Sequence, residues 1–108
     1  MEFNMRQVKR FTVIDLPDIV NFEANLSLKE KLEEICKQKE RNVAVDLTNV
    51  SFIGSLGVGL LAFAKKMTED SKGNFCLIGP NRTITRIINR TGLKGIFTVY
   101  RDESQIPD

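Results

Sequence analysis

Apolar residues along the chain follow two spacings, one typical of strands and one typical of helices. Residues 10–16 form a β-rich run that a proline ends, and we expect a strand there, with a short edge strand around residues 3–5. Short apolar runs at 43–47 and 74–78 predict two more strands, of which the first is typical of a central strand. A last edge strand is expected at residues 98–100.

Two helices are expected between the strands at residues 10–16, 43–47 and 74–78. Ser27 and Glu30 have the spacing of a capping box, and the apolar stripe that follows predicts an amphipathic helix over residues 28–38. A second helix, apolar on most sides, is expected to begin with the Ser55 hydroxyl as its N-cap and to stop at Gly73.

This alternation of strands and helices predicts an α/β fold, in which a mixed sheet of four or five strands is covered by helices. The length of 108 residues suits one hydrophobic core without disulfide or metal support. We therefore expect a single domain over residues 1–108, with its core at about residues 10–102 and a frayed tail at residues 103–108.

Composition narrows the function classes that fit this fold. The chain has no histidine, and Cys36 and Cys76 lie far apart without a CxxC pair, which argues against a zinc or redox site and against Ser-His or Cys-His hydrolases. We expect no metal, no cofactor and no catalytic residue. The longest apolar stretch, residues 60–64, is far below the ~20 residues of a membrane span, so a cytoplasmic protein without a membrane span is expected.

Basic residues gather in the last third of the chain. The net charge is only +2, but residues 71–101 contain six basic residues and no acidic one. A third helix is expected after Asn81 as its N-cap, and if it extends far enough, one ridge on it carries Arg82, Arg86, Arg90 and Lys94. Such a ridge is either a solvated helix face or a strip that steers an acidic partner. The pI of 8.6 lies below the value above ~9 that is typical of nucleic-acid-binding domains, so no direct nucleic acid binding is expected.

A glycine-rich segment joins the central strand to the second helix. Gly54, Gly57 and Gly59 are spaced G-x-x-G-x-G, which differs from both the Walker loop and the G-x-G-x-x-G dinucleotide fingerprint. One interpretation is a phosphate cradle at the helix start, and the other is close packing of the helix against the sheet. The spacing alone leaves both open.

Two motifs of the chain resemble the signatures of the STAS family, typified by the anti-sigma factor antagonists. The family's loop reads Asp-Leu-x-x-Val-x-Phe-Ile/Met-Asp-Ser-Ser/Thr-Gly-Leu-Gly, and the chain matches it at Asp46-Leu47, Val50, Phe52-Ile53, Ser55, Gly57 and Gly59. Residues 81–97 resemble the second signature, a helix that ends in Thr/Ser-Gly-Leu and precedes a hydrophobic pair. The likeness extends over residues 10–102 and implies a STAS-like α/β domain.

The resemblance implies a regulatory binding protein rather than an enzyme. It implies a partner that is both anti-sigma factor and serine kinase and that phosphorylates Ser55, and a protein phosphatase that reverses this step. Gly54 replaces the family's aspartate, Leu56 replaces the following Ser/Thr, and Asn21 replaces an acidic turn residue. The expected partner-binding residues are Asn21, Gly54, Ser55, Leu56, Gly57, Val58, Arg82, Arg86 and Arg90.

Physical chemistry supports a switch at Ser55 independently of the resemblance. Free N–H groups and the helix dipole stabilise a phosphate at a helix start, whereas a partner packed over that point does not tolerate the added charge of about −1.5 to −2. The alternative is that Ser55 is only a helix cap. Two further function classes stay open: an accessory STAS subunit of a transport or lipid-trafficking complex without phosphorylation, and a nucleotide-binding domain.

Overall fold

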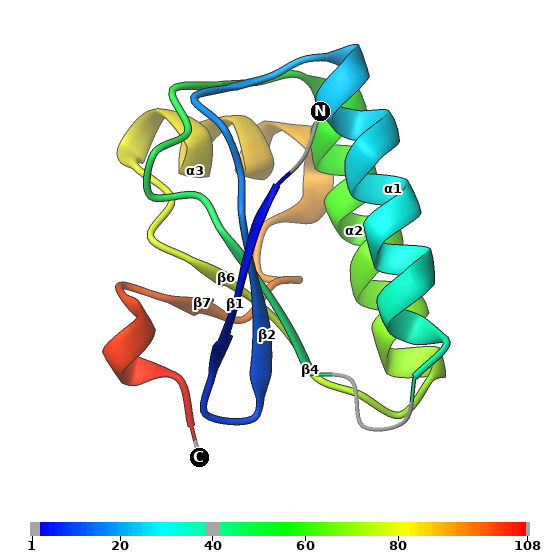
Figure 1. The fold of residues 1–108 in the computed structure, drawn as a ribbon. Helices are drawn as coiled ribbons and strands as arrows, with labels where there is room; N and C mark the ends of the chain where they lie inside the picture. Colours follow the sequence, from blue (N-terminus) through cyan, green and yellow to red (C-terminus); the bar gives the residue numbers. More distant parts are fainter. Residues whose placement is uncertain (1–2, 39–41, 108) are drawn as a thin grey trace.

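The structure, a computed structural model, describes residues 3–38 and 42–107. Three helices cover one face of a five-stranded sheet, and the C-terminal segment lies against the other face (Figure 1). In chain order the elements are β1 (Asn4–Val8), β2 (Phe11–Asp15), β3 (Ile19–Val20), α1 (Phe22–Cys36), β4 (Asn42–Asp46), β5 (Phe52–Ile53), α2 (Ser55–Asp70), β6 (Phe75–Ile78), α3 (Arg82–Ile88), the π-helical turn η1 (Asn89–Leu93), β7 (Val99–Tyr100) and the 3-10 helix η2 (Glu103–Gln105).

The strands of the main sheet follow the order β1-β2-β4-β6-β7. β1 and β2 form an antiparallel hairpin, and the other neighbouring pairs are parallel. Because each crossover adds its strand on the same side of the previous one, right-handed crossovers place all three helices on one face. The expected α/β fold with a mixed sheet is confirmed, with β3 and β5 as an additional short parallel pair.

Strand β4 lies at the centre of the sheet and is buried on both faces. Val43 and Val45 pack into the main core beneath the helices, whereas Ala44 packs on the opposite face with Cys76 and Ile106. The Cys76 thiol is free, and burial raises its pKa to about 11. This central strand fixes the point at which the chain leaves the sheet toward α2.

Helix α1 begins earlier than its sequence pattern predicts. Asn21 is its N-cap, and the Asn21 Oδ1 accepts a hydrogen bond of 3.0 Å from the Ala24 N–H. Ser27 lies inside the helix, so the expected capping box at Ser27 is wrong. The earlier start follows from the pairing of β3 with β5, which turns the chain into the helix directly after Val20. The predicted apolar stripe is confirmed, since its members are buried: Leu28, Leu32 and Ile35.

The C-terminal segment is ordered, so the expected fraying is wrong for residues 103–107; residue 108 lies outside the described residues. The side chain of Asp102 caps η2 by accepting a hydrogen bond from the Ser104 N–H. Ile106 is only 1% exposed because it fills the face of the sheet that the helices leave open. A tertiary contact thus orders a segment whose local sequence is polar.

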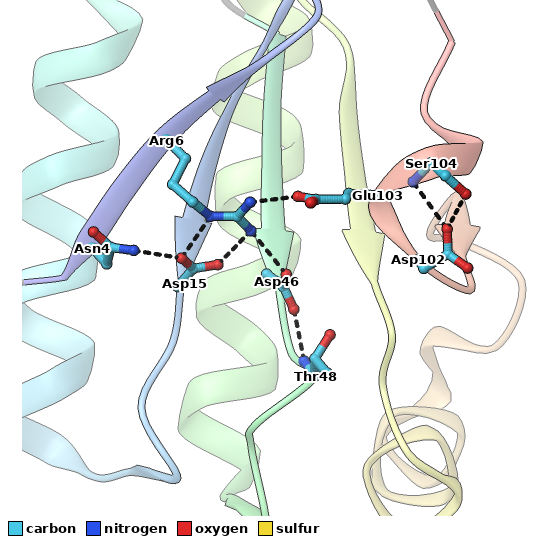
Figure 2. A network of polar contacts seen from close by, with 8 residues as sticks. All are labelled: Asn4, Arg6, Asp15, Asp46, Thr48, Asp102, Glu103 and Ser104. Atoms are coloured by element: carbon cyan, nitrogen blue, oxygen red, sulfur yellow. Dashed lines mark hydrogen bonds and ion pairs between the residues drawn. The ribbon is translucent and has the colours of Figure 1, made fainter.

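One arginine connects the hairpin, the central strand and the C-terminal segment. The guanidinium of Arg6 donates two hydrogen bonds of 2.8 Å to the carboxylate of Asp15 and one of 3.2 Å to Asp46, and it also pairs with Glu103 (Figure 2). The other oxygen of Asp46 accepts a hydrogen bond of 2.8 Å from the Thr48 N–H. Hydrogen bonding to Arg6 holds the pKa of Asp15 below its usual range.

This arrangement predicts a loss of stability in acid. Because the pKa of Asp15 is lower in the folded state than in the unfolded chain, its contribution is complete above the ordinary value of 3.8 and disappears as the pH falls through the folded-state value. We expect Arg6→Met to lower the free energy of unfolding at pH 7 by about 1–2 kcal/mol and to flatten its dependence on pH below 5.

Urea unfolding at pH 7, 5 and 3 measures both effects. The matched control is Lys66→Met, which removes the exposed ion pair of 3.0 Å between Lys66 and Asp70. That variant should change stability by less than ~0.5 kcal/mol at each pH. Equal losses for Arg6→Met and Lys66→Met would show that the Arg6 network has no special role.

Candidate functional site

The segments that precede α1 and α2 are held together beside the helix starts. β3 pairs with β5, so that Ile19 lies opposite Phe52. The Asp18 carbonyl accepts hydrogen bonds of 2.8 Å from the Ser51 N–H and 3.2 Å from the Phe52 N–H. This pairing brings the first turns of both helices to one edge of the molecule (Figure 1).

Helix α2 begins at Ser55, one residue earlier than a cap at Ser55 requires. Gly54 occupies the N-cap position with an extended backbone (φ −88°, ψ 174°), and it has no side chain with which to cap the helix. The expectation that the Ser55 hydroxyl is the N-cap is therefore wrong. The first intrahelical bond runs from the Val58 N–H to the Gly54 carbonyl at 3.1 Å, so the amides of residues 55–57 have no acceptor within the helix. Ser55 is exposed beside these amides.

The glycines of the loop differ in what surrounds them. A β carbon at Gly57 would lie 2.6 Å from Cγ1 of the buried Ile53 and 3.2 Å from Oδ1 of Asn25, whereas one at Gly59 would have no neighbour within 4 Å. The packing interpretation is therefore confirmed at Gly57 and does not apply to Gly59. Gly57 and Val58 are both buried, so neither lies on the surface where the sequence predicted partner contacts.

Large apolar side chains are exposed around the two helix starts. Ile19 and Phe52 are each 52% exposed, Phe22 is 67% exposed and Leu56 is 63% exposed. We call this set, together with the half-exposed Leu26, the apolar rim: Ile19, Phe22, Leu26, Phe52 and Leu56. Of these five residues, the sequence analysis predicted only Leu56 as a partner contact. A signal for two of the others was present in the sequence, because Phe22 and Leu26 form an i, i+4 apolar pair outside the buried stripe of α1.

The basic ridge is shorter than expected. Asn81 caps α3 as predicted, since its Oδ1 accepts a hydrogen bond of 2.8 Å from the Ile84 N–H. The regular helix ends at Ile88, and the turn that follows contains Gly92 at φ 82°. Arg82 and Arg86 therefore share one face of α3, whereas Arg90 lies in η1 and Lys94 lies beyond it. All four side chains are exposed.

Asn21 is the N-cap of α1. This structural role explains the residue without a partner contact.

Neither a metal site nor a membrane-spanning helix is present in the part of the chain that the structure describes. No group of three or more His, Cys, Asp or Glu side chains there could hold a metal ion, and no helix there is long and apolar enough to cross a bilayer. A cleft of about 700 Å³ opens beside the Arg6 network, and not at the glycine-rich loop. Its carboxylates at Asp15 and Asp46 are already paired with Arg6.

The contrast between the two glycines gives a test of how α2 is positioned. We expect Gly57→Ala to lower the free energy of unfolding by about 1–3 kcal/mol, because Ile53 is buried and must move. Gly59→Ala is the control, and it should raise stability by about 0.5–1 kcal/mol because alanine favours a helix interior. Thermal and urea unfolding of both variants measures the difference. Equal effects would show that no close approach at Gly57 constrains the helix.

The chain is similar to known proteins over nearly its whole length. The family model of the STAS domain matches residues 2–106. The anti-sigma-B factor antagonist of Staphylococcus epidermidis is 32% identical over 72 residues, which cover 67% of each protein. Solved structures of the anti-sigma factor antagonist SpoIIAA from Bacillus share the fold: the unphosphorylated form superposes with a TM-score of 0.80 at 23% identity (95% of this chain, 91% of the other). The phosphorylated form gives 0.75 at 23% identity (95% of each). These relatives are regulatory proteins rather than enzymes. The chain itself belongs to the STAS domain family.

Proposed function

We propose that the chain is an anti-sigma factor antagonist that binds an anti-sigma factor with serine kinase activity and is released when Ser55 is phosphorylated. The observation that carries this proposal is the position of Ser55, an exposed hydroxyl at the start of α2 beside the apolar rim. The antagonist names of its relatives support the same function. A protein phosphatase returns the domain to its binding form.

The free domain can carry a phosphoryl group at Ser55 without refolding. In the transfer, Ser55 Oγ bonds to the γ-phosphorus of the kinase's ATP, ADP leaves, and the hydroxyl proton passes to a base of the kinase. The product lies beside the N–H groups of residues 55–57, which have no acceptor within the helix, and beside the positive end of the α2 dipole. The fold shared with the phosphorylated form of SpoIIAA is consistent with this tolerance.

A partner on the apolar rim does not tolerate the same group. Ile19, Phe22, Phe52 and Leu56 offer apolar side chains that a partner would remove from water. A dianion at Ser55 would then be enclosed next to apolar surface, where an unpaired charge costs several kcal/mol. Contacts with the apolar rim provide the affinity for the partner, and the phosphorylation state of Ser55 determines whether the partner can bind.

The main prediction concerns three forms of Ser55. We expect phosphorylation or Ser55→Asp to weaken binding to the anti-sigma factor kinase by about 10-fold or more, equivalent to about 1.4 kcal/mol, while Ser55→Ala binds like the unmodified chain. Calorimetric titration with the kinase purified from the same source cells measures the affinities, and thermal melts check that the fold is unchanged.

The rim provides an independent control for this experiment. Phe22→Ser should weaken binding of the unmodified chain, since Phe22 is 67% exposed and makes little contribution to the core. Equal affinities for all three Ser55 forms, with Phe22→Ser still weakening the complex, would leave an interface without a switch and favour the accessory-subunit alternative. Tight nucleotide binding by the isolated chain would instead favour the nucleotide-binding alternative.

The second prediction concerns the missing acidic residue. Gly54 has a negative φ, and a β carbon there would be 3.9 Å from the nearest side-chain atom, so Gly54→Asp fits without strain. The new carboxylate can cap α2, and we expect stability to rise by a few tenths of a kcal/mol. If the acid also assists recognition, the kinase should phosphorylate Ser55 faster in this variant. A thermal melt and a phosphate-transfer time course measure the two effects separately, and Gly54→Ala is the control without a carboxylate.

A further inference from the structure

A groove beside α3 is formed by residues outside the Ser55 site. Between α3 and the edge strand β7 lies a cleft of about 160 Å³, whose apolar lining comprises Leu77, Ile88, Leu93, Phe97 and Val99. An open hollow of about 420 Å³ adjoins it and is lined by Pro80, Arg82, Thr85, Arg86 and Asn89. The two share Pro80, Thr85 and Asn89, so they form one continuous groove. No residue of the groove belongs to the apolar rim or to the Ser55 loop.

The apolar half of the groove has the size of a side-chain pocket. It is smaller than the ~300–1,000 Å³ that is usual for small-molecule sites. Ile88 and Leu77 are buried at its base, whereas Val99 is 51% exposed at its mouth on the edge strand. A pocket of this kind receives one large apolar anchor residue of a partner, which is how most binding energy is concentrated in protein interfaces.

The other half of the groove is cationic. Arg82, Thr85, Arg86 and Asn89 follow at i, i+3, i+4 and i+7, so they form one stripe along α3 that borders the pocket. Arg82 and Arg86 are exposed, and residues 71–101 contain no acidic residue that could neutralise them from within the segment. An occupant with carboxylates next to its apolar anchor is complementary to both halves at once. A nucleic acid backbone would leave the apolar pocket unfilled.

We propose that this groove binds an acidic, extended peptide segment of a partner protein, with one aromatic or branched aliphatic side chain in the cleft between α3 and β7 and with flanking carboxylates on Arg82 and Arg86. The guanidinium groups pair with carboxylates in a bidentate manner, which sets the direction of the peptide. Because the groove and the apolar rim share no residue, binding of this peptide uses no residue of the Ser55 site.

A displayed library of random twelve-residue peptides tests the proposal with the unmodified domain as bait. We expect the selected peptides to combine Asp or Glu with one Leu, Ile, Phe, Met or Trp at a fixed spacing. Synthetic copies should shift the amide NMR signals of Thr85, Asn89, Phe97 and Val99. The double variant Arg82→Glu/Arg86→Glu should weaken their binding by about 10-fold or more, and Val99→Glu should weaken it without changing the charge of α3.

The matched control is Lys29→Glu/Lys37→Glu, which changes the net charge by the same amount at exposed positions of α1 and its C-cap, outside the groove lining. It should weaken binding by less than about 3-fold, since exposed charges at a distance are screened. The proposal is overturned by selection of no peptide, by selected peptides without acidic residues, by NMR shifts confined to other surfaces, or by equal losses in the two double variants. Ser55→Asp should leave peptide binding unchanged, which separates this test from that of the Ser55 switch.

Discussion

Helix α2 begins so close to Ile53 that a β carbon at residue 57 would lie 2.6 Å from the Ile53 side chain. This contact determines how the first turn of the helix is rotated. With Gly57 and Val58 turned into the core, Ser55 and Leu56 are turned toward solvent. Because Ile53 is held in β5 by its pairing with Val20 of β3, the same contact also fixes the site relative to the start of α1. The outward direction of the Ser55 side chain therefore follows from the packing of Gly57 and Val58 beneath it.

The regular elements were predictable because their periodicity is strong. The strand at 43–47 and the helix capped by Asn81 were found from the sequence because each has a clear apolar pattern and a clear boundary residue. The start of α1 was not found, since Ser27 and Asn21 are both good caps, and the choice between them depends on the long-range pairing of β3 with β5. The cap of α2 was misplaced by one residue because glycine gives no local signal for that role.

The parts of the site that sequence reasoning missed depend on tertiary contacts. Phe22 and Phe52 are apolar, and a sequence pattern alone assigns such residues to a core. The exposure of Phe52 follows from the short β3 and β5 pair, which uses Val20 and Ile53 for packing and leaves Ile19 and Phe52 outside. Phe22 is the first residue of α1 and lies outside its buried stripe. Likewise, Ile106 is an isolated apolar residue in a polar tail, and only the open face of the sheet explains why it is buried.

The C-terminal segment has a consequence for how the domain can be attached to other structures. In Figure 1 the C-terminal turn η2 (red) lies at the lower left, whereas α1 and α2 both begin at the top. Ile106 and the Arg6–Glu103 ion pair hold this last segment against the sheet, so the point of exit is fixed relative to the helices. An attachment beyond η2 would therefore meet the domain at the end opposite to the helix starts. Such an attachment would leave the first turns of α1 and α2 uncovered.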